Sequence, residues 1–188
     1  MMERFAEASP LFKARVAGAF YVLCILLGIS AEMFLSGSLR SAANLIGTAF
    51  YVGVTLILYD LFKPVNKRLS LLAAVFSLAG CAVTLLDLLH LRSPYISSLE
   101  FFGVYCLLIA YLILRSTFMP RIIGMLLALA GLGWLTFLSP ALGRQLFGYT
   151  MVTGLIGEGS LMLWLLVMGV NVQRWNQQAG TARANAAS

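Results

Sequence analysis

Six long apolar stretches, separated by short polar breaks, dominate the pattern of the chain. Each is long enough to cross a hydrocarbon core of ~30 Å as an α-helix. The pattern therefore predicts an all-α, polytopic transmembrane bundle of about six helices. The expected spans are Val16–Leu35, Ala42–Phe62, Leu69–Leu91, Ile96–Leu114, Ile122–Leu138 and Leu146–Val170.

The breaks between the stretches contain residues that end helices. Pro64, Pro94, Pro120 and Pro140 each lie in a break, and proline cannot continue a helix. Because the connections are short, consecutive helices should be antiparallel neighbours. We expect a leader at 1–13, a six-span domain at 14–175 and a disordered polar tail at 176–188.

The composition supports a membrane protein. The chain is 61% hydrophobic and only 11% charged, with a mean hydropathy of +0.92. Soluble domains are typically about 45–50% apolar and about 25% charged. None of the three cysteines belongs to a CxxC pair, so no disulfide framework is expected.

Lysine and arginine predict the orientation. Basic residues in the connections accumulate on the cytoplasmic side of a membrane. Ten fall on one predicted side, namely Arg4, Lys13, Arg15, Lys63, Lys67, Arg68, Arg115, Arg121, Arg174 and Arg183. Only three fall on the other, namely Arg40, Arg92 and Arg144. We therefore expect both termini in the cytoplasm and the chain in a plasma membrane or an inner membrane.

The net charge of +6 has consequences for partners. The basic residues lie between apolar runs rather than in a patch with aromatic residues, so nucleic acid is not expected. Membrane lipids, through their anionic head groups, are the expected partners. A homo-oligomer or a membrane partner is left open.

Polar side chains within the spans are the candidate site. Depth along each helix places them in the outer half of the bilayer, from every span except the fifth. They are Glu32, Asn44, Asp87, His90, Glu100 and Glu158. Glu158 is the most informative, because an ionised group at the bilayer centre costs roughly 2.5–3.5 kcal/mol on insertion scales. It should face the bundle interior.

Three interpretations of these residues stay open. The acids could be structural ties to Arg40, Arg92, Arg144 and His90. They could line a polar pocket, open to the outside, for a cation, a proton or a small polar ligand. Asp87 and His90, which share a helix face, could also join Glu158 around a metal.

Cofactor and catalytic motifs are missing from the sequence. It has no HExxH, GxSxG or P-loop pattern, and a single histidine cannot supply bis-His haem ligation within one subunit. No cofactor is expected, and no catalytic residue can be assigned.

Five segments of the chain have a recognisable pattern, namely Leu61–Ala74, Tyr111–Gly124, Leu129–Trp134, Gly157–Glu158 and Leu163–Leu166. They resemble a mostly bacterial family known as domain of unknown function 4386. The resemblance runs from about Ala14 to Trp175. It implies a small multi-span membrane protein of bacterial type, and it brings no established activity or site residue.

The sequence favours a protein that binds a small ligand, an ion or a proton, as a transporter or a transport accessory. A membrane-embedded, metal-dependent enzyme acting on lipid is one alternative. A non-catalytic scaffold or sensor partner is the other. An enzyme is the less favoured interpretation.

Overall fold

The computed structural model describes residues 9–89, 91 and 97–187, and every regular element within those residues is helical. Its long helices are α2 (Pro10–Met33), α3 (Gly37–Phe62), α4 (Lys67–Leu88), α5 (Ser98–Arg115), α6 (Arg121–Leu135) and α8 (Phe147–Val167). The short elements are η1 (Thr136–Leu138), α7 (Pro140–Gln145) and α9 (Val172–Ala187).

Six of these segments are long and apolar enough to cross a membrane, with Arg121–Leu138 counted as one. They coincide with the six predicted spans to within a few residues, except that the first helix begins earlier, at Pro10. The earlier start has a local cause. Ser9 caps the helix by accepting a hydrogen bond from the Phe12 amide, and proline is favoured in the first turn.

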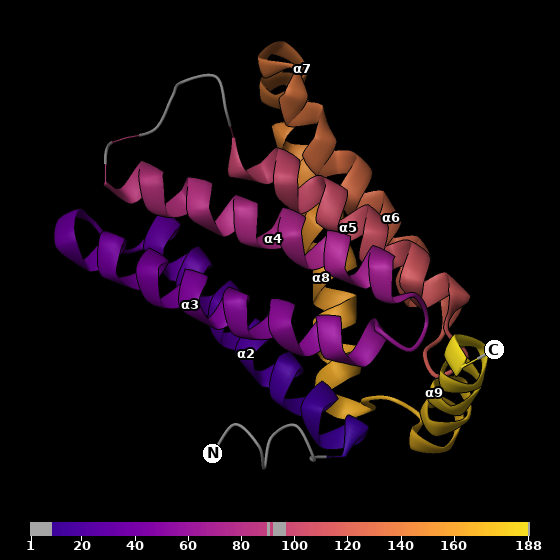
Figure 1. Ribbon diagram of the computed structural model, residues 1–188. Helices are drawn as coiled ribbons and strands as arrows, with labels where there is room; N and C mark the ends of the chain where they lie inside the picture. Colours follow the sequence, from indigo (N-terminus) through magenta and orange to yellow (C-terminus); the bar gives the residue numbers. More distant parts are fainter. Residues whose placement is uncertain (1–8, 90, 92–96, 188) are drawn as a thin grey trace.

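The spanning helices form a closed ring. In ring order the neighbours are α2, α3, α4, α5, α6 and α8, and α8 then contacts α2. Figure 1 shows α2, α3, α4 and α5 following one another, with α8 passing behind them. The ring therefore has an interior to which every spanning helix can contribute side chains.

The outer surface of the ring is apolar. Large side chains from all six spans are exposed there, among them Leu26, Leu56, Leu71, Tyr111, Met125 and Leu163. Such a surface is unfavourable in water and suits hydrocarbon. Together with the six apolar helices, it indicates a membrane-embedded, multi-pass protein.

The two ends of the bundle differ in charge. The end with the α3–α4 turn, the α5–α6 turn and α9, here called the basic end, carries most of the described lysines and arginines. Asp60 lies at this end and binds both Lys13, at 2.5 Å, and Lys63. The end with the α2–α3 connection and α7 is here called the α7 end. It carries only two basic residues among those described, Arg40 and Arg144.

The C-terminal tail differs from the sequence prediction. Residues 176–187 continue helix α9, whereas the polar composition predicted disorder. Contacts with the bundle explain the helix. The Trp175 indole donates to the Leu61 carbonyl at 2.9 Å, and Gln178 accepts from the Thr117 amide at 3.1 Å. These bonds stabilise a helix that its own sequence supports weakly.

Candidate functional site

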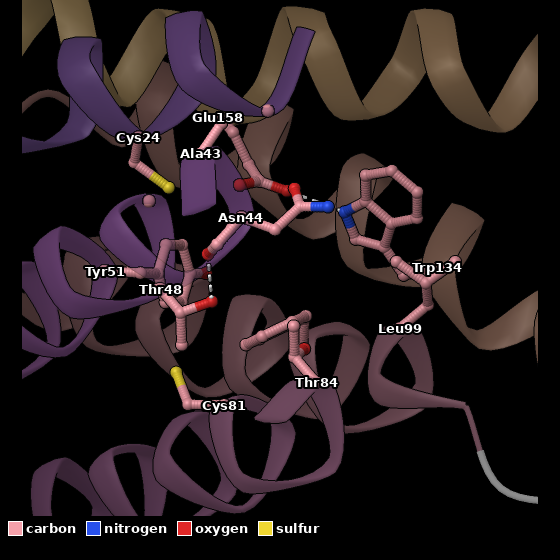
Figure 2. Close-up of a pocket in the computed structure, with 13 residues that line it drawn as sticks. Cys24, Ala43, Asn44, Thr48, Tyr51, Cys81, Thr84, Leu99, Trp134 and Glu158 are labelled. Atoms are coloured by element: carbon pink, nitrogen blue, oxygen red, sulfur yellow. Dashed lines mark hydrogen bonds between the residues drawn. The ribbon is translucent and has the colours of Figure 1, made fainter. Parts of the chain in front are cut away.

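A cavity of about 240 Å³ lies between the spanning helices, in the half of the bundle nearer the α7 end. Its polar lining consists of Asn44, Thr48, Tyr51, Thr84, Trp134 and Glu158. The other lining residues are Cys24, Gly28, Ala43, Gly47, Cys81, Leu99 and Phe102. All six spanning helices contribute, so the cavity belongs to the interior of the ring (Figure 2).

Glu158 lies near the middle of its helix. It is about 11 residues into α8, or ~16 Å at ~1.5 Å per residue. Its Oε2 accepts a hydrogen bond from the Tyr21 hydroxyl at 2.6 Å, and its Oε1 accepts one from the Trp134 indole at 2.7 Å. Each carboxylate oxygen has a second lone pair, which these bonds leave available.

Gly157, the residue before Glu158, allows α8 to pack closely on α6. A Cβ at Gly157 would lie 2.5 Å from the Leu126 carbonyl oxygen and 2.6 Å from the Ala130 Cβ, both on α6. Only glycine allows this approach. The close packing of α8 on α6 brings the Glu158 carboxylate within reach of the Trp134 indole.

Glu158 has no basic partner within the described part of the chain. The ion pairs there are Lys13–Asp60, Lys63–Asp60 and Arg40–Glu32. Glu158 is half-buried, and both of its donors are neutral side chains. The site thus presents a carboxylate supported by hydrogen bonds alone.

Unlike Glu158, two other polar groups in the cavity have no hydrogen bond to any described residue. One is the side-chain amide of Asn44, and Figure 2 shows Asn44, Trp134 and Glu158 directed into the same part of the cavity. The other is the Tyr51 hydroxyl, on a side chain only 7% exposed. Polar groups that line a cavity and have no partner among the described residues can bind a ligand or water there.

Aromatic rings form much of the wall. The Tyr51 ring meets the Phe102 ring edge-on at 4.9 Å between centroids, and the Tyr21 ring at 5.7 Å. Edge-to-face packing of this kind stabilises ring positions beyond simple burial. The aromatic part of the wall is therefore held together by contacts between rings.

The bundle is closed between the cavity and the basic end. A Thr55–Ser77 hydrogen bond of 2.6 Å lies one turn beyond Tyr51 along α3. Large, fully buried apolar side chains follow, among them Leu58, Leu61, Phe62, Leu112, Ile113 and Leu165. The cavity thus occupies one half of the bundle and a packed apolar layer fills the other.

The structure brings two of the predicted site residues together, since Asn44 and Glu158 line one cavity. Glu32 is exposed and pairs with Arg40, as the structural-tie interpretation expects. Asp87 is exposed and Glu100 half-buried, and neither lines this cavity. His90 lies outside the described residues.

The metal site proposed from sequence stays a prediction. The structure does not place Asp87 in the cavity that Glu158 lines. Within the described ranges, no three His, Cys, Asp or Glu side chains gather closely enough to hold a metal ion.

Sequence reasoning missed several residues of the site. Thr48 and Tyr51 follow Asn44 at helical spacing, and Thr55 continues the row, so a polar stripe on the second span could have revealed them. The sequence predicted no polar site residue from the fifth span. The Trp134 indole on α6 points inward to Glu158, so that span does contribute a polar group.

Comparisons with known proteins agree with the resemblance found in the sequence. A family model described as Domain of unknown function (DUF4386) matches residues 39–100 and 95–169. An uncharacterized protein of the archaeon Archaeoglobus fulgidus is 31% identical over 127 residues, which cover 63% of this chain and 76% of the relative. This relative is archaeal, whereas the resemblance implied a protein of bacterial type. No solved structure matches. With most of its length covered by that model, the chain belongs to the family described as Domain of unknown function (DUF4386).

Proposed function

We propose that this protein binds a small ligand within the membrane, as a transporter or a transport accessory, and that Glu158 is the anchoring residue. One observation carries the proposal. A carboxylate near the middle of a spanning helix faces a cavity and has only neutral donors from the described residues.

The energetic argument follows from the cost of charge in a membrane. An acidic residue at mid-span costs roughly 2.5–3.5 kcal/mol on insertion scales. A purely structural link between α2, α6 and α8 could be made by a neutral side chain at lower cost. A carboxylate with free lone pairs facing a cavity suits reversible binding of a proton, a cation or a hydrogen-bond donor.

The asymmetry of the bundle supports a transport role. The cavity is confined to one half, and apolar packing closes the other. We propose that the basic end is cytoplasmic, because basic residues favour that side. Both termini are then cytoplasmic, the cavity lies in the outer half, and the membrane is a plasma or an inner membrane.

Access to the cavity can be tested with its own cysteine. Cys24 lines the cavity, whereas Cys106 is buried outside its lining. Variants that retain only one of these thiols would be treated with methyl methanethiosulfonate in membranes. We expect Cys24 to react at least about tenfold faster than Cys106, because reaction with a thiol requires access.

A pair of glycine variants tests whether the reagent reaches Cys24 through the cavity. Gly28 lines the cavity, and a Cβ at this position would meet no atom within 4 Å, so Gly28→Leu should reduce the free space of the cavity. Gly148 has equal room but lies on the outer surface. Gly28→Leu should slow Cys24 labelling and Gly148→Leu should not. Equal labelling of Cys24 and Cys106, or no effect of Gly28→Leu, would refute the proposal.

A further inference from the structure

We infer that the ligand is a small lipophilic organic cation, such as a protonated amine, whose ammonium group binds Glu158. This inference rests on the proposed function and specifies the chemistry of the same cavity. It draws on the charge, the aromatic wall, the free polar groups and the size of the cavity.

The charge of the lining has a single sign. Glu158 is its one acidic residue, and no lysine, arginine or histidine occurs among the described residues that line the cavity. The two neutral donors hold the carboxylate in place and leave one lone pair on each oxygen. In a partly apolar interior, such a group attracts a cation and repels an anion strongly.

The aromatic wall favours the same class. Tyr51, Phe102 and Trp134 all line the cavity beside Glu158. Aromatic faces attract organic ammonium groups, and aromatic rings are a recurring feature of sites for alkylated amines. The Trp134 N–H is already bonded to Glu158, so its ring is the part left to contact a ligand.

The rest of the lining distinguishes an organic cation from a bare metal ion. Calcium and magnesium need about six or more oxygen ligands in close geometry. Here Glu158 is the single acidic residue of the described lining, no three His, Cys, Asp or Glu side chains gather there among the described residues, and most of the wall is aliphatic or aromatic. An apolar body with one charged group matches this wall better.

Size and the free polar groups limit the ligand further. A cavity of about 240 Å³ corresponds to roughly eight water molecules at ~30 Å³ each. That is space for a ligand of roughly ten non-hydrogen atoms. The unpaired Asn44 amide and Tyr51 hydroxyl offer a second polar contact, so the site suits an amine with one additional hydrogen-bonding group.

Three probes of similar shape and different charge test the inference. Benzylamine is cationic at pH 7, benzyl alcohol is neutral and benzoate is anionic. Binding to the full chain in lipid nanodiscs would be measured by calorimetry. We expect benzylamine to bind at least about tenfold more tightly than benzyl alcohol, and benzoate not to bind.

Two variants, each lacking one carboxylate, test whether Glu158 causes the preference for benzylamine. Glu158→Gln should reduce the preference for benzylamine to less than about twofold, since the charge is removed and the shape kept. Glu32→Gln removes an exposed carboxylate outside the cavity lining and should leave the preference unchanged. A preference that survives in Glu158→Gln, or is lost in Glu32→Gln, would overturn the inference.

Other outcomes separate this inference from the proposed function. If benzyl alcohol binds as tightly as benzylamine and Gly28→Leu abolishes both, the cavity binds ligands but does not select cations, and the inference is overturned while the proposed function stands. If no probe binds, the cation inference fails, and the Cys24 labelling experiment decides the proposed function on its own.

Discussion

Glu158 joins three helices through two hydrogen bonds. Tyr21 on α2 and Trp134 on α6 each donate to one of its oxygens, and Tyr21 is only 1% exposed. A buried donor that loses its acceptor costs about 1–3 kcal/mol. The hydrogen-bonding role and the charge of Glu158 can therefore be separated by two substitutions.

Glu158→Leu should lower the free energy of unfolding by about 2–5 kcal/mol, because it leaves both donors unpaired. Glu158→Gln retains an acceptor for one donor and leaves the other unpaired, so it should cost about half as much, roughly 1–3 kcal/mol. Thermal unfolding of the purified variants would measure the difference. Glu32→Leu, which removes an exposed ion pair, is the control and should cost less than about 1 kcal/mol.

Comparing Glu158→Gln with Glu158→Leu tests whether the charge of Glu158 is needed for folding. If Glu158→Gln destabilises the protein as much as Glu158→Leu, the ionised carboxylate is itself needed for folding. Glu158 would then be a structural tie, as the scaffold alternative requires. If only Glu158→Leu is strongly destabilising, the charge is retained for another purpose, and ligand binding is the purpose that the cavity supports.

Close helix contacts depend on glycine in this bundle. Apolar side chains gain little by leaving lipid for a protein interior, so membrane helices associate through close packing and polar contacts. A Cβ at Gly18 on α2 would lie 2.5 Å from the Leu166 amide nitrogen on α8, and Gly157 approaches α6 as closely. These two glycines position α8 against both of its neighbours in the ring.

The glycines on either side of Glu158 form a matched pair for testing this packing. Gly157→Ala should separate α8 from α6 and lower both thermal stability and cavity binding, since backbone atoms oppose the new methyl group. Gly159→Ala meets no atom within 4 Å and should be neutral or stabilising, because alanine favours a helix by about 1 kcal/mol. Thermal unfolding of both variants checks the prediction. Equal effects would show that close packing at Gly157 is not required.

The molecule as a whole is a ring of antiparallel helices with a cavity toward one end. Six spans place the α2–α3 connection and the α3–α4 turn on opposite sides of the membrane. The distribution of basic residues favours the cytoplasm for the second of these. Orientation and topology can be tested together.

Single cysteines at Ser36 and Asn66, in a chain without native cysteines, should react from opposite sides. We expect Ser36→Cys to react with a membrane-impermeant maleimide in intact cells, and Asn66→Cys only after permeabilisation. The α3 helix separates the two positions by a full span, and Ser36 lies at the α7 end. Labelling of both from one side would contradict the topology, and the reversed pattern would contradict the orientation.

The sequence alone determined the six helices, and it singled out Glu158 as the leading candidate for the site. Continuous apolar runs and proline-containing breaks are local signals, and backbone groups in hydrocarbon must be satisfied within each helix. The cost of a mid-membrane charge identified Glu158 before any contact was known. The row of polar residues Asn44, Thr48 and Tyr51 on α3 is also a local signal in the sequence, although only Asn44 was predicted to belong to the site.

Only the tertiary structure decided which polar groups meet. Tyr21 and Trp134 lie 137 and 24 residues from Glu158, and their approach depends on the rotation and spacing of three helices. Depth along a helix can be counted from sequence, but the direction a side chain faces in the bundle cannot. For that reason Glu32, Asp87 and Glu100 share the predicted half of the membrane with Glu158, but not its cavity.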